Sequence, residues 1–196
     1  MSAQQTMVRI YDRVMKSSKQ RRYYGGSGFY NFGYWATGAA SQREASEALV
    51  DTLLARLPDK GVEAAFHFDT RAAFLAEALR VLKPGGALVL SDILFRGFTA
   101  PVADRLGVPK PNLVPDIVSY RALFEAVGFQ DIRVEDRTDD CLGGFRRSLV
   151  AWPASERGKG AMSLKSSLGT ALVCRLIAGY FGAVSKAYLL VSARKP

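Results

Sequence analysis

The sequence is poor in the residues that build disulfide frameworks and metal centres. It has two cysteines, Cys141 and Cys174, and a single histidine, His67. Two cysteines at this separation give neither a disulfide framework nor the close spacing of metal ligands. The class of small disulfide-rich secreted domains is therefore excluded, and a reducing, cytoplasmic location is the expectation.

Long uninterrupted apolar runs are also missing. The N-terminal stretch "MSAQQTMVRIYDRVMKSSKQRR" lacks the apolar core that a signal peptide needs. The most apolar stretch, residues 167–191, is interrupted by Arg175 and Lys186 and contains three glycines. Since a transmembrane helix needs about 20 mostly apolar residues in a row, we interpret this stretch as a buried helix followed by a strand. Membrane contact is the less favoured alternative.

The charge is strongly positive but not concentrated. The 196 residues carry a formal net charge of +9, which can attract nucleic acid, anionic lipid or acidic substrates. Basic residues cluster only at 19–24 and 145–148. This distribution favours a solvated basic surface over a nucleic-acid interface and leaves peripheral contact with a membrane open.

Residues 1–40 mix charge, glycine and aromatic side chains. The segment "RRYYGGSGFYNFGYW" has seven aromatic residues within fifteen positions, which is typical of neither a regular helix nor a strand. We expect a mobile segment that folds over something flat or apolar. A helix should follow at once, because Ser41 and Glu44 have the spacing of a capping box; Leu57-Pro58 should end it.

Beyond residue 60, strands and helices are expected to alternate, which indicates an α/β layer fold. "ALVLSDILF" is a near-continuous apolar run, typical of a strand buried on both faces. "KPGG" should stop the helix before it. The full expectation is a strand at 62–68, a helix capped by Asp69 or Thr70, a strand at 87–95, a loop at 96–118, a helix capped by Ser119 and ended by Gly128, a strand from 130, a polar connection at 151–163, a helix at 161–185 and a strand at 187–193.

Four blocks in this order resemble a known family. "AFLAEALRVLKPGGALVLSDILF" and "YRALFEAVGFQDIRVEDRT" are similar to the helix–KPGG–strand block, and the next helix and strand, of class I S-adenosylmethionine (SAM)-dependent methyltransferases. "YYGGSGFYNFGYW" resembles the N-terminal lid of the ubiquinone/tocopherol-type small-molecule enzymes. "EAAFHF" resembles the segment after strand four, which holds acceptor-site residues. The resemblance implies a Rossmann-like methyltransferase fold with helices on the faces of its sheet, an aromatic lid at 1–40 and an α/β domain at 41–196.

One block of that family is missing. In this fold a strand runs into a glycine-rich turn that approaches the cofactor, and an acidic residue about 20 positions later binds the ribose hydroxyls. Between Leu57 and Val62 the chain has only Pro58, Asp59, Lys60 and Gly61. Two βαβ steps take about 30 residues each, so about 60 residues are absent. The glycines at 25–28 do not replace the turn, because no strand precedes them. SAM binding by this chain alone is therefore expected to be impaired.

The shortened sheet should have a new edge. In the full fold the strand at 62–68 would pair with the missing first strand. An exposed apolar edge invites pairing with another chain. The sequence therefore predicts a dimer, a swapped assembly or docking onto a larger complex.

The resemblance implies roles for particular residues, each with an ordinary structural alternative. His67 matches an acceptor-site base, and its imidazole suits removal of the acceptor proton. Glu63, four residues earlier, would orient it or bind an acceptor hydroxyl. For each, a structural or solvent-facing role is as good an explanation.

The aromatic lid and one acid complete the candidate site. Tyr24, Tyr34 and Trp35 are the candidates for contact with the cofactor, because a sulfonium gains energy over an aromatic face. Tyr23, Tyr30 and Asp92 are the candidates for the acceptor. The alternatives are hydrophobic anchoring for the aromatic residues and a cap or loop hydrogen bond for Asp92.

Three functions remain open at this point. The chain is a SAM-dependent methyltransferase-family protein for a lipophilic small molecule, a non-catalytic accessory subunit that docks through its sheet edge, or a cofactor-independent enzyme that keeps the acceptor pocket. An engineered or incomplete version of a longer enzyme would also fit.

Overall fold

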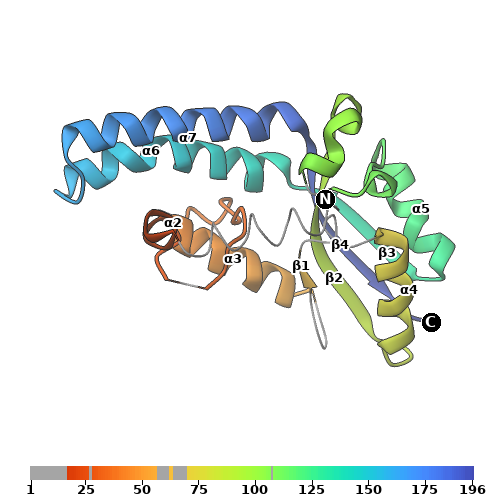
Figure 1. Cartoon of the computed structure of the whole chain (residues 1–196). Helices are drawn as coiled ribbons and strands as arrows, with labels where there is room; N and C mark the ends of the chain where they lie inside the picture. Colours follow the sequence, from red (N-terminus) through yellow and green to blue (C-terminus); the bar gives the residue numbers. More distant parts are fainter. Residues whose placement is uncertain (1–16, 27, 57–61, 64–69, 107) are drawn as a thin grey trace. The chain divides into compact units, whose positions relative to one another are not determined.

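The computed structural model describes residues 17–26, 28–56, 62–63, 70–106 and 108–196. Their contacts group into two compact units. The first contains Val50–Arg137 and Ser185–Pro196, and the second Ser18–Leu49 and Thr138–Val184. The elements of both are labelled in Figure 1. This grouping does not test the boundary predicted at residue 40, which stays a prediction.

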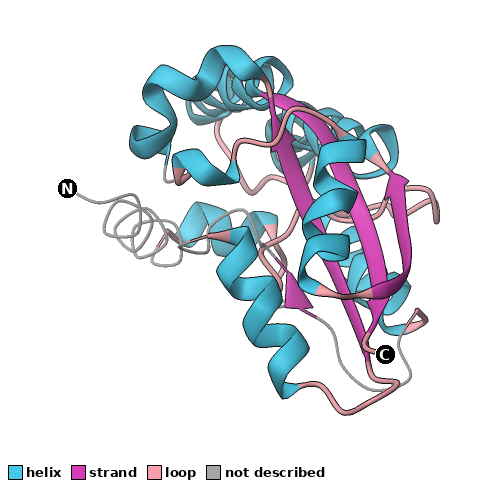
Figure 2. Ribbon diagram, turned by 90° about the vertical axis from the view of Figure 1, so that its right-hand side faces the viewer, coloured by secondary structure: helices cyan, strands magenta, loops and turns pink. Residues whose placement is uncertain are grey.

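The first unit is built on a four-stranded sheet of order β1-β2-β4-β3. Its strands are β1 (Val62–Glu63), β2 (Ala87–Phe95), β3 (Gln130–Asp136) and β4 (Ser185–Arg194). β1 runs parallel to β2, whereas β4 is antiparallel to both of its neighbours. Figure 2 shows β1 as the short arrow beside the longer strands.

This sheet confirms the expected α/β fold and its shortened half-sheet. All nine residues of β2 are buried, as their continuous apolar run predicts. Among the described strands, β1 pairs only with β2, through Val62 opposite Leu90 and Glu63 opposite Ser91. The strand beyond residue 63 predicted from the sequence lies outside the described residues. Among the described strands, β1 therefore lies at an edge of the sheet.

Two helices pack on the sheet in the first unit. α4 (Arg71–Val81) begins at Thr70, whose side chain accepts a hydrogen bond from the backbone N–H of Ala73. α5 (Ile117–Val127) ends at Gly128, which has a left-handed φ of 108°, so the glycine stop is confirmed. The core between helices and sheet consists of Leu75, Ala78, Leu88, Leu90, Leu94, Tyr120, Phe124, Leu189 and Val191 with their neighbours.

Two sequence expectations in this unit need correction. α5 is capped by Asp116, not Ser119: the Asp116 carboxylate accepts from the Ser119 N–H at 2.7 Å, and this pairing holds the pKa of Asp116 below its usual value. The expected loop at 96–118 contains two 3₁₀ helices, η2 (Gly97–Leu106) and η3 (Lys110–Asn112). The prolines of this stretch disfavour a continuous α-helix.

The second unit is helical. It contains α2 (Ser18–Tyr23), α6 (Gly144–Gly158), which continues from a π-helical turn η4 (Asp139–Gly143), and α7 (Leu164–Val184). The helix α3 (Gln42–Leu54) begins in this unit and ends in the first. Its predicted capping box is confirmed, because the Ser41 hydroxyl accepts from the Glu44 N–H and donates to the Glu44 carboxylate.

The predicted polar connection at 151–163 is wrong over most of its length. α6 continues through Pro153 to Gly158. A proline inside a helix normally costs about 3 kcal/mol, but here Pro153 lies on the buried side with Phe145, Leu149 and Glu156, and its carbonyl accepts a hydrogen bond from Ser167 of α7. Packing against α7 overrides the local preference.

The expectation that the apolar stretch forms a buried helix is also wrong for α7, although β4 is buried as expected. The buried side of α7 holds small or polar residues, including Ser167, Thr170, Cys174 and Ala178. Most of its large apolar side chains are exposed. α7 is long and apolar enough to cross a membrane, and 28% of its most apolar window is buried.

Candidate functional site

Aromatic side chains of the second unit meet in one cluster, which we call the aromatic cluster. Tyr23 and Tyr24 are buried, at 8% and 7% exposure. Tyr23 meets Tyr24, Phe145 and Trp152 in edge-to-face geometry, with centroids 5.3–6.2 Å apart. The members are Tyr23, Tyr24, Tyr30, Phe32, Phe145, Trp152 and Phe181.

Hydrogen bonds fix the N-terminal segment onto this cluster. The Tyr23 hydroxyl lies 3.0 Å from the Gln42 side-chain oxygen and 3.3 Å from the Ser148 hydroxyl. Gln42, buried at 2%, donates to the Asn31 carbonyl and to the Ser46 hydroxyl. Burial raises the pKa of Tyr23 far above its usual value. The hydroxyl therefore stays protonated, and it acts as a hydrogen-bond donor rather than as a base.

Tyr34 and Trp35 are half-buried beside the cluster. Backbone hydrogen bonds tie Tyr34 to Ala45 and Trp35 to Asp140, and the Trp35 indole donates to the Phe32 carbonyl at 2.9 Å. The Trp35 ring lies against Gly144, where an added Cβ would come within 2.2 Å of it. Tyr30, Tyr34 and Trp35 are all partly exposed to solvent.

Asp92 lies in the first unit, in a buried polar group that we call the Arg71 network. β2 continues for three residues beyond Asp92, so this residue lies inside the strand. Its carboxylate accepts from the Arg71 guanidinium at 2.7 Å and from the Tyr120 hydroxyl at 2.8 Å. The Arg71 guanidinium also donates to the backbone carbonyls of Asn112 and Ile93.

The Arg71 network is a buried ion pair between Arg71 and Asp92, with Tyr120 beside it. Arg71 is 2% exposed and Tyr120 1%, and the guanidinium carbon is 5.4 Å from the Tyr120 ring centroid. Burial, followed by the charge of Asp92, raises the pKa of Tyr120 well above its usual value. The predicted contact between Asp92 and an acceptor stays a prediction; in this structure its partners are protein groups.

Sequence reasoning missed the partners of Asp92. Arg71 occupies the first turn of α4, where the helix dipole disfavours a cation. A basic residue in that place is a usable signal that its charge is balanced elsewhere. Tyr120 and Asn112 gave no such signal.

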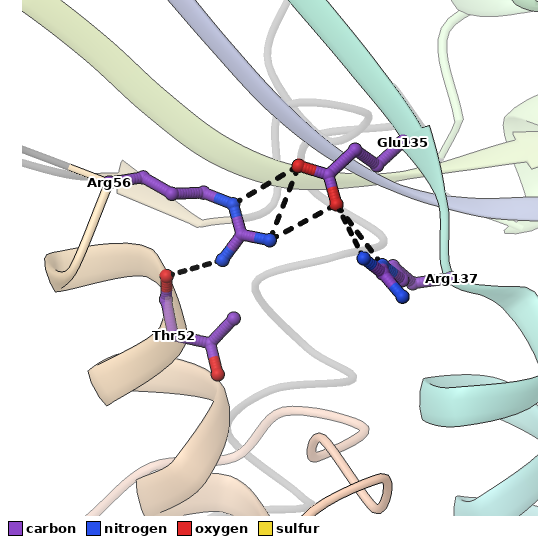
Figure 3. Close-up of polar contacts among 4 residues, drawn as sticks. All are labelled: Thr52, Arg56, Glu135 and Arg137. Atoms are coloured by element: carbon purple, nitrogen blue, oxygen red, sulfur yellow. Dashed lines mark hydrogen bonds and ion pairs between the residues drawn. The ribbon is translucent and has the colours of Figure 1, made fainter.

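A second charged group of the first unit lies near the end of α3 (Figure 3). Arg56 donates to both carboxylate oxygens of Glu135 at 3.1–3.3 Å and to the Thr52 carbonyl at 2.7 Å. Arg137 donates to the same carboxylate at 2.7 Å. The hydrogen bond from Arg56 is the main reason that the pKa of Glu135 is lowered. This arrangement fastens α3 to β3.

The structure does not describe the side chains of the two candidate catalytic residues, His67 and Glu63. His67 lies outside the described residues, and of Glu63 the structure describes only the backbone, in β1. Both assignments stay predictions.

The strands that the structure describes do not lead into the glycine-rich turn that holds the cofactor in the similar family. β2 leads into the 3₁₀ helix η2 and β3 into the π-helical turn η4, so neither of these two strands runs into a glycine-rich turn and an α-helix. Gly25 and Gly33 have positive φ, and an added Cβ would meet Arg43 at 2.9 Å at the first position and Ala45 at 2.6 Å at the second. Within the described ranges there is also no group of three metal-ligating side chains.

Comparison with known proteins shows where this fold occurs. No protein-family model matches the chain. Over 94 residues it is 33% identical to the erythromycin 3''-O-methyltransferase of Saccharopolyspora erythraea, a match that covers 41% of this chain and 30% of that enzyme. The chain therefore spans less than a third of the length of that curated relative.

Solved structures resemble the chain over most of its length. The cyclase SpnF matches with a TM-score of 0.60 and 19% identity, over 100% of this chain and 96% of its own. A mycolic acid cyclopropane synthase crystallised with SAH and CTAB has a TM-score of 0.61 and 15% identity, over 89% and 93% of the two chains. The cyclopropane synthase MmaA2 of Mycobacterium tuberculosis has a TM-score of 0.57 and 15% identity, over 92% and 95%.

By its fold the chain therefore resembles the class I SAM-dependent methyltransferases, and a stretch of its sequence is similar to one curated methyltransferase.

Proposed function

We propose that the chain is a methyltransferase-family protein for a lipophilic small molecule, and that it does not bind SAM tightly by itself. One observation carries the second part. α3 ends at Leu54 and β1 begins at Val62, and the seven residues between them cannot contain a strand, a glycine turn and a helix. A nucleoside cofactor needs that close backbone approach.

Calorimetric titration of SAM and of its demethylated product tests this part. At tens of micromolar protein we expect no saturable one-to-one heat. The Saccharopolyspora erythraea methyltransferase, titrated under the same conditions, is the positive control. Saturable one-to-one binding by this polypeptide would show that the chain carries a cofactor site after all.

The acceptor part of the proposal rests on the lid segment and on the matched relative. That relative's name describes methylation of an oxygen on erythromycin, and we propose a similar acceptor: a hydroxyl on a sugar-bearing lipophilic natural product. The half-buried rings of Tyr30, Tyr34 and Trp35 offer flat apolar faces to such a molecule.

Tryptophan fluorescence tests the acceptor, because both tryptophans, Trp35 and Trp152, lie in the second unit. A sugar-bearing macrolide should change the emission in a saturable manner, and Tyr34→Ala should weaken binding about tenfold. Phe98→Ala, which removes an aromatic ring that is 65% exposed in the first unit, should leave binding unchanged. An unsaturable response, or equal effects of the two variants, would contradict the proposal.

The edge strand supports a second candidate, an accessory subunit that docks through its sheet. β1 has β2 as its described neighbour on one side only, and such edges pair readily with other chains. Light scattering at micromolar concentration should then show a dimer or larger assembly, and a clean monomer would count against it.

The fold likeness also keeps a third candidate open, since one neighbour of the same fold is described as a cyclase. Fold alone does not fix the chemistry. Conversion of an unsaturated acceptor without SAM would favour a cofactor-independent enzyme.

A further inference from the structure

The outer face of α7 is a continuous apolar surface within the second unit. Its side chains recur about every four residues, which places them along one side of the helix. Each is between 39% and 65% exposed. This surface, which we call the α7 face, consists of Leu164, Leu168, Leu172, Val173, Leu176, Ile177 and Tyr180.

The polarity of α7 is reversed relative to an ordinary surface helix. A surface helix normally buries large apolar residues and exposes polar ones. In α7 the buried side carries Ser167, Thr170, Cys174 and Ala178, and two of these make hydrogen bonds: Ser167 to the Pro153 carbonyl and Thr170 with the Lys19 ammonium. Helices in contact with lipid have this arrangement: their small residues face the protein and their large apolar residues face outward.

The charge around the α7 face points to the same kind of partner. α7 contains Lys165 and Arg175 and no acidic residue. From Arg157 to Val184, within the second unit, the sequence has four basic residues and no acidic one. Apolar residues next to basic ones, without acids, match the acyl chains and headgroups of an anionic lipid leaflet.

We propose that the α7 face docks in the interface of an anionic lipid bilayer. A second copy of the chain fits less well, because pairing two α7 faces would bring Lys165 and Arg175 of both copies together without acidic partners on that helix. A lipid surface needs no shape complementarity, and it supplies the opposite charge.

The helix lies on the bilayer rather than across it. α6 and α7 pack together, and only residues 159–163 connect them. A crossing by α7 would therefore take α6 or the connection through the hydrocarbon. α6 carries Arg146, Arg147, Glu156 and Arg157, and burial of such charges in a membrane is strongly unfavourable.

Vesicle sedimentation tests this docking. The probe is vesicles of phosphatidylcholine with about one-third phosphatidylglycerol, compared with pure phosphatidylcholine. We expect binding to the anionic vesicles, weakened in about 0.5 M salt. Leu172→Gln and Leu176→Gln should each weaken it about tenfold, and Lys165→Gln and Arg175→Gln about fivefold each.

The substituted side chains are exposed, so these variants should fold as the parent does, and their circular dichroism spectra should match that of the parent. The matched control is Val81→Gln with Val118→Gln, which removes apolar side chains that are 62% and 78% exposed in the first unit. The control should bind vesicles as the parent does.

Three results would overturn the docking. The first is no sedimentation with anionic vesicles, and the second is equal loss in the control and in the α7 variants. The third is a concentration-dependent dimer that Leu172→Gln and Leu176→Gln dissociate while vesicles bind nothing, which would assign the α7 face to a second copy. None of these outcomes depends on the SAM titration, so the proposed function stands or falls separately.

Discussion

Replacing Asp92 by asparagine should test the Arg71 network directly. The substitution keeps the shape of the side chain but removes its charge. In the native arrangement one Asp92 oxygen accepts from Arg71 and Tyr120, and the other accepts from the Ile93 N–H. Whichever way the asparagine amide turns, its NH₂ faces the N–H of Arg71 or of Ile93. A buried donor is then left without an acceptor.

The magnitude follows from burial. The side chains of Arg71 and Asp92 are 2% and 0% exposed, and arginine keeps its charge at any accessible pH. Breaking a buried ion pair from one side costs about 3–5 kcal/mol. With a typical urea m-value of about 2 kcal/mol per molar, the unfolding midpoint should fall by about 2 M.

Urea unfolding followed by circular dichroism provides the measurement. The matched control is Glu77→Gln on the same α4 helix. Glu77 pairs with Arg80 at 2.6 Å, with both side chains at least 60% exposed, so its loss should leave the unfolding midpoint almost unchanged. An Asp92→Asn midpoint within about 0.3 M of the parent would refute the assignment of this pair as a buried, fully formed interaction.

The remaining predictions concern other contacts. Gly144→Ala should destabilise the protein by about 1–3 kcal/mol and shift the tryptophan emission, because the new methyl would overlap the Trp35 ring; Gly169→Ala, in open space within α7, should be neutral or stabilising by up to about 1 kcal/mol. Raising the pH above about 10 should lower the free energy of unfolding. The pKa of Tyr120 is raised in the folded state, so its stabilising contribution is lost as the pH rises through the folded pKa. In a series of alkaline urea titrations, Tyr120→Phe should flatten this decline. Glu135→Gln should cost up to about 1 kcal/mol at neutral pH, and the difference from the parent should close as pH falls below about 4, because the folded pKa of Glu135 is lowered and its stabilisation is lost on protonation.

Local signals in the sequence were sufficient for most elements. The capping box at Ser41, the "KPGG" stop and Gly128 fix backbone conformations through a few neighbouring residues, and each was confirmed. The apolar run of β2 and the absence of a block before Val62 were enough to predict a half-sheet with an edge.

Tertiary contacts decide what the sequence could not show. Pro153 predicts a break, but its burial against α7 keeps α6 intact. The apolar residues of α7 predict burial, whereas its small residues make the protein contacts. For the candidate site, the sequence singled out Tyr23, Tyr24 and Tyr30 but not the cluster members Phe145, Trp152 and Phe181, which follow more than 100 residues later. The hydrogen-bond partners of Tyr23, Gln42 and Ser148, likewise come from other helices.

The second unit is assembled from two pieces of chain that are separated by residues 50–137. The hydrogen bonds that hold Tyr23, Gln42 and Trp35 all join residues outside that interval. The shortened connection at 57–61 lies inside it. During synthesis, therefore, the N-terminal piece can complete these contacts only after α6 and α7 have been made. Insertions or deletions near residue 60 would leave these hydrogen bonds unchanged. A cofactor-binding segment could therefore be inserted at residues 57–61 without changing the residues that hold the N-terminal piece in the second unit.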